Sequence, residues 1–488
     1  MVLPLSVQES HLLSAISGAA SRKKIALYLV GGYLRDALLK RKKENPDFDF
    51  CLARGALAFG RALARSLKAG FVVLDKGHAS CRVVRKMGGK AYTLDFTDFR
   101  GKTLAQDLLH RDFTLNTMAL ALDDAVAGKP LQDSLIDLYG AQKDIAAKVV
   151  RLTYPGAFDE DPLRILRAFS LSATFRFTIE KETLGKASRK RKLLKSVSWE
   201  RIRDEIFRIL DAPDSAAVLT QLDEVSILGL VFPEIEPMRA LAQGPYHHLD
   251  VLKHSIETVR KWEGLEIQMR RREYLAQYLD EPLSSGRKRR ALVKLAALLH
   301  DIGKPKALRR EDGKLKFHGH EAIGARMSQE AARRLRLSNE EADALRKMVM
   351  WHLRPGYLGD SLVVSARARF RYFRDTGSEG ASILLLSLAD QRATKGPLTT
   401  AKSRRMHETV CRRLLKEYFR NLEVEKVPRL LNGNDLMKEF GLSPSPLIGT
   451  MLGRLEELQA IGKITTREEA LKCAARIYKT LRHARSRY

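Results

Sequence analysis

Two adjacent glycines, Gly31 and Gly32, separate a strand-like run from a helix-like run near the start of the chain. The run IALYLVGG ends at this pair, YLRDALLKR follows with the spacing of an amphipathic helix, and FDFCLA then alternates like a second strand. Asp47 and Asp49 are two residues apart in that strand, so their side chains point to the same face of a sheet. The order strand, glycine turn, helix, strand therefore predicts a small mixed sheet with helices packed on it.

After this segment the sequence predicts further strands and then a long helical region. Further strand-like runs occupy Phe71–Asp75, Cys81–Lys86 and Ala91–Phe96, and RALARSLKAG before them reads as a helix. From about Asp159 onward helical periodicity prevails almost throughout. We therefore expect an α+β fold, in which a small N-terminal sheet-and-helix head precedes a long all-α body.

The charge balance points to a polyanionic partner. The 488 residues are enough for roughly three domains, and 87 Lys+Arg against 58 Asp+Glu give a net charge of +29. Such a field attracts nucleic acid or an acidic membrane surface. The basic runs Lys186–Lys195 and Gly286–Lys294 are expected to be solvated helix faces, the commoner case.

The cellular setting follows from what the sequence lacks. Its four cysteines are scattered and form no C-x-x-C pair, which argues against a disulfide framework or a zinc knuckle. No run approaches the ~20 apolar residues that span a bilayer, and the N-terminus has no secretory signal pattern. A reduced, cytoplasmic setting with no membrane association is expected.

The same-face carboxylates have two interpretations. Asp47 and Asp49 could bridge two Mg²⁺ ions that activate an attacking hydroxyl and stabilise a leaving pyrophosphate. The glycine turn with Arg35 could then present amides and a guanidinium to a triphosphate. The simpler interpretation is a turn followed by an ordinary strand.

Three downstream motifs favour the nucleotide site. They are HRDFTLNTMAL (His110–Leu120), LIDLYGAQKDI (Leu135–Ile145) and DEDPLRILRAF (Asp159–Phe169). Together with LVGGYLRD and DFDF, and in the same order, they closely resemble the class II tRNA nucleotidyltransferases and bacterial poly(A) polymerases. The resemblance covers about Leu29–Leu210 and implies a polymerase-β-like nucleotidyltransferase head.

The resemblance also implies roles for individual residues. It assigns Asp47 and Asp49 to catalysis through Mg²⁺, and the glycine turn with Arg35 to the incoming triphosphate. The implied nucleotide-binding residues are Gly31, Gly32, Arg35, Arg111, Asp112, Asn116, Asp161, Arg164 and Arg167. Of these, Arg111 and Asp112 would shape the sugar and phosphate pocket, with Asn116 one helical turn on, and the last three would select the base. The chain departs from the family pattern at His110, Ala141 and Ser170, and the first and last of these departures weaken the assignment of individual phosphate contacts, not of the chemistry.

The base-selecting role also has a physical argument. Asp161 and Arg164 are three residues apart and are expected on one helix face. A carboxylate only accepts and a guanidinium only donates, a pattern that fits the amino donor and ring-nitrogen acceptor of cytosine or adenine but not guanine or uracil. The alternative is a surface salt bridge worth about 0.3 kcal/mol.

A second constellation of histidines and aspartates lies in the body. The segments HHLDVLKHSIETV, LLHDIGKP, FHGHEAIGA, MWHLRP and LSLADQRA carry adjacent His-Asp and further His and Asp residues, a ligand set for a divalent metal. The series resembles the HD phosphohydrolase superfamily, whose core ligands would be His254, His300, Asp301 and Asp390. His320 and His352 could hold a second metal. His247, His248 and His318 are expected to support the ligands or to lie on the surface.

The resemblance leads to an expected domain order and function. The C-terminal segment Leu430–Lys472 is similar to the tail helices of HD-bearing tRNA nucleotidyltransferases. The expected domains are a head (1–145), a helical nucleotide-selecting neck (146–240), an HD domain (241–400) and a tRNA-binding tail (401–488). We expect a template-independent enzyme that adds CCA nucleotides, all or CC alone, to the acceptor end of tRNA from CTP and ATP, releasing pyrophosphate.

Several alternatives remain open at this stage. The connection TDFRGKTLAQDLLH between TLDF and RDFT is short, and CC-adding relatives lack the longer flexible segment that others often carry there. This favours a CC-adding enzyme, while an A-adding enzyme or a poly(A) polymerase shares every motif. A further alternative is an inactive head on an HD phosphohydrolase or RNA-binding scaffold. The HD substrate, its metal and the oligomeric state are not readable from the sequence.

Overall fold

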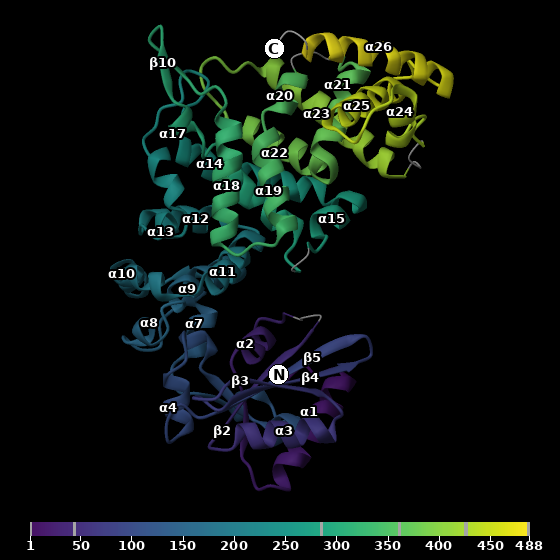
Figure 1. Ribbon diagram of the computed structural model, residues 1–488. Coiled ribbons are helices and arrows are strands. Elements are labelled where there is room, and N and C mark those ends of the chain that lie inside the picture. The colour runs from purple at the N-terminus through teal and green to yellow at the C-terminus, as the bar shows by residue number, and fades with distance from the viewer. Residues whose placement is uncertain (1, 42–44, 284–285, 360–362, 424–427, 486–488) are drawn as a thin grey trace. The chain divides into compact units, whose positions relative to one another are not determined.

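The structure is a computed structural model that describes residues 2–41, 45–283, 286–359, 363–423 and 428–485 (Figure 1). The chain forms two compact units. The first comprises Met1–Asp214 and Val218–Val231, and the second comprises Ser215–Ala217 and Phe232–Tyr488. The boundary falls within helix α12 (Ser215–Glu224). None of the described helices combines the length and hydrophobicity needed to span a bilayer.

A seven-stranded mixed sheet forms the centre of the first unit. Its strand order is β3-β4-β5-β2-β1-β6-β7, with β2 and β5 parallel and every other pair antiparallel. The strands are β1 (Leu27–Val30), β2 (Asp47–Leu52), β3 (Gly70–Asp75), β4 (Ser80–Met87), β5 (Lys90–Asp98), β6 (Met118–Ala121) and β7 (Leu135–Asp137). The five strands predicted from the sequence are confirmed, and β6 and β7 extend the sheet beyond them.

Strand β2 divides its side chains between two faces. Phe48 and Phe50 are at most 1% exposed, and Phe50 stacks on Phe96 of β5 at 5.0 Å between ring centroids. Phe59 of α3 (Ala56–Ser66) meets the edge of Phe96 at 5.3 Å and closes this core. Because side chains alternate along a strand, the buried phenylalanines direct Asp47 and Asp49 to the opposite face.

Helices cover the sheet and continue the first unit beyond it. The head helices are α1 (Val7–Ser21), α2 (Gly32–Leu38), α3, α4 (Leu104–Leu109), α5 (Leu122–Val126), α6 (Leu131–Ser134) and α7 (Ala141–Ala146). They are followed by α8 (Ala157–Glu160), α9 (Arg164–Phe175), α10 (Lys181–Lys190), α11 (Trp199–Asp211) and α13 (Leu228–Val231). A small parallel pair, β8 (Val149–Val150) and β9 (Thr178–Ile179), interrupts the helical succession. Helix α9 packs on α11, so one face of α9 is fixed.

The second unit is helical except for a short hairpin. Its helices are α14 (Val251–Met269), α15 (Glu273–Asp280), α16 (Arg289–Leu299), α17 (Lys304–Ala307), α18 (His320–Arg334), α19 (Asn339–Trp351), α20 (Arg354–Leu358), α21 (Ala366–Thr376), α22 (Gly380–Ala393), α23 (Ala401–Glu423), α24 (Gly433–Phe440), α25 (Pro446–Ala460) and α26 (Arg467–Arg485). The hairpin pairs β10 (Arg309–Glu311) with β11 (Lys314–Lys316), which the helical periodicity did not predict. Helix α14 packs on α16 and α22, and α18 packs on α19.

The basic run Gly286–Lys294 is not a solvated helix face, so that expectation was wrong. Arg289 is 4% exposed and pairs with Glu379, while Lys294 is fully buried. The Nζ of Lys294 lies 3.3 Å from Glu263 of α14, whose carboxylate also accepts the backbone N–H and hydroxyl of Ser215 at 2.6 Å each. Buried charges require such partners, because an unpaired charge in a low-dielectric interior is costly.

This buried pair gives a stability prediction. Replacing Glu263 with alanine should lower the unfolding free energy by about 3 kcal/mol, because Lys294 loses its nearest carboxylate in the core. The measurement is guanidinium denaturation followed by tryptophan fluorescence, since the buried Trp262 is adjacent. Glu257→Ala on the same helix is the control. Glu257 pairs with Arg260 and Lys261 nearer the surface, so its loss should cost at most about 1 kcal/mol. Equal losses would contradict the argument.

Candidate functional site

A cavity of about 580 Å³ in the first unit brings together the residues to which the sequence assigned catalysis and nucleotide binding. Its wall includes all nine residues expected to bind nucleotide, Gly31 and Gly32 among them, and both aspartates of β2. Further wall residues, not singled out in the sequence, are Tyr33, Asp36, Arg41, Phe50, Arg82, Asp95, Thr97, Arg100, Asp107, Leu171, Thr174, Phe175 and Arg208. The structure thus brings together residues separated by more than 100 positions in the chain.

Three carboxylates share one face of the sheet. Asp47 and Asp49 lie on β2, and Asp95 stands directly beside Asp49 in the parallel register of β5. Arg82 of β4 holds Asp95 by two hydrogen bonds of 2.8 Å, from Nε to Oδ1 and from Nη2 to Oδ2. Asp95 was missed from the sequence because only strand pairing, not spacing, places it next to Asp49.

The electrostatics of this face suit a divalent cation. Burial raises the pKa of Asp49, although the nearby Arg111 guanidinium opposes that shift. A bound cation would favour the ionised form, since an adjacent positive charge lowers the pKa of a carboxylate. Clustered carboxylate oxygens are the donors that hard divalent ions prefer. Asp47 and Asp49, with Asp95 beside them, therefore fit a divalent metal site.

The glycine turn is shaped by the site itself. Gly31 has φ +76° and ψ −137°, a backbone conformation that residues other than glycine rarely adopt. A Cβ at this position would lie 3.1 Å from Nη1 of Arg111 and 3.2 Å from Oδ2 of Asp49. Backbone, guanidinium and carboxylate therefore approach one another closely only because residue 31 has no side chain.

Two hydrogen bonds and an ion pair join α2 to α9 across the cavity. Nη1 of Arg35 donates to Oδ1 of Asn116 at 2.6 Å, and Nδ2 of Asn116 donates to Oδ1 of Asp112 at 2.9 Å. Oδ2 of Asp112 then lies 2.8 Å from Nε of Arg167. Burial alone would raise the pKa of Asp112, but Arg167 and the donor from Asn116 outweigh it, and the pKa lies below its ordinary value. Asn116 closes a 3₁₀ turn, Thr114–Asn116, rather than following Asp112 along an α-helix.

The expectation that Asp161 and Arg164 share a helix face was wrong. Helix α8 ends at Glu160, and Asp161 is extended, with φ −142° and ψ 100°. The cause is Pro162, because a residue before proline is driven out of the helical region. Both side chains still line the cavity, but each has another partner. Asp161 binds Nη2 of Arg201 at 2.8 Å, and Nη1 of Arg164 binds Glu160 at 3.0 Å.

The three departures from the family pattern have local explanations. The backbone carbonyl of His110 accepts a 3.0 Å hydrogen bond from Nη2 of Arg164, so this position supports Arg164 through its main chain. The hydroxyl of Ser170 donates to Glu205. Ala141 is fully buried, and its N–H donates to Oδ1 of Asp137 at 2.8 Å. Asp137, three residues before Gly140, therefore fastens the start of α7.

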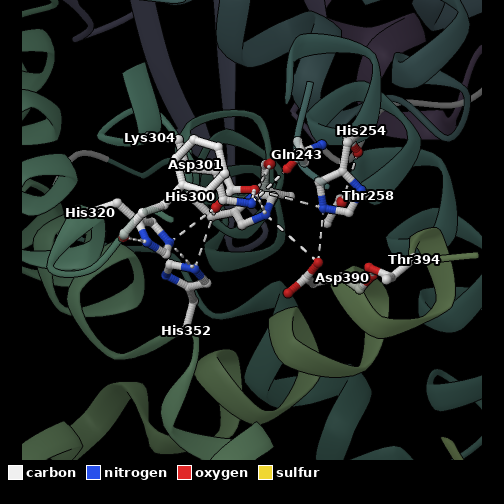
Figure 2. Close-up of polar contacts among 12 residues, drawn as sticks. Gln243, His254, Thr258, His300, Asp301, Lys304, His320, His352, Asp390 and Thr394 are labelled. Carbon is white, nitrogen blue, oxygen red and sulfur yellow. Dashed lines mark hydrogen bonds and ion pairs between the residues drawn. The ribbon is translucent and has the colours of Figure 1, made fainter. Parts of the chain in front are cut away.

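The histidines and aspartates of the body converge in the second unit (Figure 2). His254 lies on α14, Asp390 on α22, and His300 with Asp301 directly after α16. His320 begins α18, and His352 follows α19. All six predicted ligands are thus brought together by the packing of these helices.

Asp301 stands between two groups of histidines. Its Oδ2 lies 3.2 Å from Nε2 of His300 and 3.8 Å from Nε2 of His254. Its Oδ1 lies 3.3 Å from Nε2 of His320 and 3.7 Å from Nε2 of His352. His254 is also 2.9 Å from Asp390. Ligand atoms roughly 3 Å apart are what bonds of about 2.1 Å to a shared ion require, so the set fits two ions bridged by Asp301.

The protonation pattern also suits metal binding. Nδ1 of His300, His320 and His352 lies 2.7–2.9 Å from a backbone carbonyl, which fixes the proton there and leaves Nε2 as a ligand. Burial lowers the pKa of His352 to about 3, so the imidazole is neutral at physiological pH. Nε2 of His300 is buried without a hydrogen-bond partner among the described residues. A buried ring nitrogen of this kind fits a metal ligand.

The remaining histidines lie around this centre. His247 meets the ring of His254 edge-on at 4.7 Å, and burial lowers its pKa to about 3. His247 and His318 line a cavity of about 330 Å³ that also contains His320 and Lys304. Lys304 donates to Oδ2 of Asp301 at 2.6 Å. His248 is exposed.

Four family models match consecutive parts of the chain. They describe the poly(A) polymerase head domain over residues 27–151 and an RNA- and SrmB-binding site of polymerase A over 176–239. An HD domain follows over 251–393, and domain 2 of the tRNA nucleotidyltransferases over 398–475.

Curated proteins and solved structures agree with these models. An A-adding tRNA nucleotidyltransferase of Deinococcus radiodurans is 32% identical over 451 residues, which is 91% of this chain and 93% of that protein. A CC-adding tRNA nucleotidyltransferase of Geobacter sulfurreducens is 29% identical over 476 residues, which is 97% of this chain and 96% of that protein. The Thermotoga maritima CCA-adding enzyme, solved in complex with tRNA, shares the fold with a TM-score of 0.61 at 20% identity, covering 98% of this chain and 96% of that one.

The histidine cluster gives a metal-content prediction. The purified protein should retain about two more divalent ions per chain than Asp301→Ala, because Asp301 is the ligand that both ions would share. His352→Ala should lose about one ion. Elemental analysis after gel filtration measures this, with His248→Ala as the control that keeps the full content. The interpretation fails if all four proteins carry the same number of ions.

Proposed function

This chain belongs to the tRNA nucleotidyltransferases that carry an HD domain, and we propose that it adds nucleotides of the CCA sequence to tRNA 3′ ends. The observation that carries this function is the cavity in which Asp47, Asp49 and Asp95 face the glycine turn, Arg35 and the start of α9. CTP would supply the two cytidines, ATP would supply the terminal adenosine only if the whole CCA end is built, and pyrophosphate leaves.

The proposed chemistry is in-line attack of the primer 3′ hydroxyl on the α-phosphate. Asp47 and Asp49 would hold two Mg²⁺ ions, which would activate the hydroxyl and neutralise the leaving pyrophosphate. Asp95 would add negative charge beside Asp49, and Arg82 fixes its orientation. Gly31 and Gly32 would leave room for the triphosphate near Arg35, and the Arg111 and Asp49 side chains both lie close to Gly31.

Base selection is proposed for Asp161 and Arg164, with Arg167 beside them. The carboxylate would accept from the amino group of cytosine or adenine, and the guanidinium would donate to the ring nitrogen. Each side chain is engaged elsewhere in the structure, with Arg201 and Glu160. Nucleotide binding would therefore exchange one set of charge-assisted hydrogen bonds for another.

The CC product is the form of the reaction we propose. The connection after β5 is short and ordered. Thr103 caps α4, accepting from the N–H of Gln106, and Arg100 donates to the carbonyl of His110 at 2.8 Å. A connection tied down in this way supports CC addition, as in the Geobacter relative, over the A addition named for the Deinococcus relative.

The helical body is proposed to clamp the acceptor arm of tRNA. The net charge of +29 favours phosphate contact, and A-form RNA is recognised mainly by shape. The four-domain division (1–145, 146–240, 241–400 and 401–488) remains a proposal. The four cysteines are free thiols, which agrees with the proposed cytoplasmic location.

A second activity is proposed for the HD centre. Its converging ligands and the adjoining cavity with Lys304 support metal-dependent hydrolysis of a phosphate ester on an RNA end or a nucleotide. The metal could be any of several divalent ions, since the set combines imidazoles and carboxylates. An inactive head on such a hydrolase is disfavoured, because all three carboxylates of the head are in place.

The product assay uses tRNA transcripts that end at the discriminator base, at C and at CC. With labelled CTP, ATP or both, the protein should add two cytidines to the first transcript, one to the second and none to the third. Asp49→Asn should reduce incorporation roughly 1,000-fold, the scale of losing one electrostatic group at the reacting phosphate. Addition of A to the third transcript would overturn the CC product, and long A tails on any RNA would indicate a poly(A) polymerase.

The glycine turn gives a separate prediction. Gly31→Ala should lower stability by about 2 kcal/mol through backbone strain and raise KM for CTP about tenfold, because its Cβ displaces Arg111 or Asp49. Gly128→Ala is the control. Gly128 also has positive φ, +66°, but an added Cβ would meet nothing within 4 Å. Gly128→Ala should lower the free energy of unfolding by about 1 kcal/mol and leave the KM for CTP unchanged. An unchanged KM for Gly31→Ala would remove the turn from the nucleotide site.

A further inference from the structure

Two arginines share one aromatic ring at the edge of the head cavity. The guanidinium carbon of Arg35 lies 4.3 Å from the ring centroid of Phe175, and that of Arg41 lies 4.8 Å from the same centroid. Phe175 is the last residue of α9, whereas Arg35 lies on α2 and Arg41 follows it. All three line the cavity.

The two guanidiniums differ in how their charge is balanced. Arg35 is 7% exposed and binds Asp36 through Nη2 at 2.8 Å. Arg41 is exposed, and its Nη1 donates to the carbonyl of Thr174 at 3.0 Å. No carboxylate of the described residues pairs with Arg41.

Arg41 differs from most arginines of the cavity wall because it has no carboxylate partner among the described residues. Most of the wall arginines form an ion pair with a carboxylate: Arg35 with Asp36, Arg82 with Asp95, Arg111 with Asp107, Arg164 with Glu160, Arg167 with Asp112, and Arg208 with Glu205. Of the other two, Arg100 turns toward the carbonyl of His110. Among the described residues of the wall, Arg41 and Arg100 are thus the two exposed arginines without a carboxylate ion pair, and Arg41 is the one whose guanidinium lies over the ring of Phe175 together with Arg35.

We propose that Arg41 is a second phosphate-binding guanidinium, which holds the β- and γ-phosphates of the incoming nucleotide and the pyrophosphate product together with Arg35. Phe175 acts as a positioning residue, because its ring faces both guanidiniums and limits where they can lie. A planar guanidinium with unused N–H donors suits phosphate oxygens. The ring also ties the phosphate-binding side of the cavity to α9, which begins with the base-selecting residues.

The inference rests on the proposed nucleotidyl transfer and has a structural alternative. In that alternative Arg41 only fastens the carbonyl end of α9, where a positive charge is favourable in any protein. A fastening role would change stability alone. A phosphate-binding role would also change the affinity for pyrophosphate, which carries neither base nor sugar.

The test compares Arg41→Ala with Arg61→Ala. Arg61 of α3 also stacks on a phenylalanine, Phe71, at 5.4 Å, but neither residue lines the cavity. We expect Arg41→Ala to raise KM for CTP and the inhibition constant of pyrophosphate about tenfold, with kcat changed less than about twofold. Arg41→Lys keeps the charge but not the planar fork and should show about a threefold effect. Arg61→Ala should leave all three parameters unchanged.

A second pair of variants tests the aromatic ring: Phe175→Leu, with Phe71→Leu as the control. Phe175→Leu should raise both constants about threefold, while the preference for CTP over UTP stays the same. Calorimetric titration of each protein with pyrophosphate and Mg²⁺ measures binding without turnover. Constants for Arg41→Ala equal to those for Arg61→Ala would overturn the proposal. A wild-type protein that incorporates no nucleotide would instead refute the proposed function, and the titration would still decide whether Arg41 binds pyrophosphate.

Discussion

The alternation of side chains along β2 is the constraint on which the nucleotide site depends. Phe48 and Phe50 are buried against Phe96, and this packing fixes which way the strand faces. A slip of one residue would bury both aspartates and expose both rings, a change that no other contact could offset. Parallel pairing with β5 then brings Asp95 beside Asp49. The metal-binding face is therefore a consequence of hydrophobic packing on the other side of the sheet.

Contacts between charged and polar side chains connect the helices around each site. The chain Arg35–Asn116–Asp112–Arg167, two hydrogen bonds and an ion pair, crosses from α2 to α9. Because each member is held by the next, a phosphate that moved Arg35 would also disturb α9, the helix that carries Arg164 and Arg167 of the proposed base-selecting set. In the HD centre, too, polar contacts hold the side chains in place. Asp301 accepts from Lys304 on one oxygen and faces histidines on both sides, so helix packing holds the ligands before any ion binds.

The sequence predicted those parts of the site that are contiguous in the chain. The glycine turn, the paired aspartates and the His-Asp series could be recognised because a short spacing decides which residues share a face. Asp95 could not be, since its role depends on which strands pair. Asp161 was misplaced because Pro162 breaks a helix that the i, i+3 spacing seemed to require. Arg289 and Lys294 lay in a run that composition assigned to solvent, and only the positions of Glu379 and Glu263 reveal their burial.

The ion pairs around the cavity determine which contacts a base would have to replace. In the proposed base selection, Asp161 and Arg164 would leave Arg201 and Glu160 before they bind a base. Cytosine or adenine would replace both lost partners with a matching donor and acceptor. Guanine or uracil would replace neither, so the half-buried carboxylate and the buried guanidinium would be left opposite groups of the same kind. Discrimination in such a site comes less from attraction to the correct base than from the cost of a wrong base that cannot restore the broken pairs. The paired resting state lowers the affinity for every nucleotide by the same amount, so the proposed selectivity arises in the bound state, where only a matching base replaces the broken pairs.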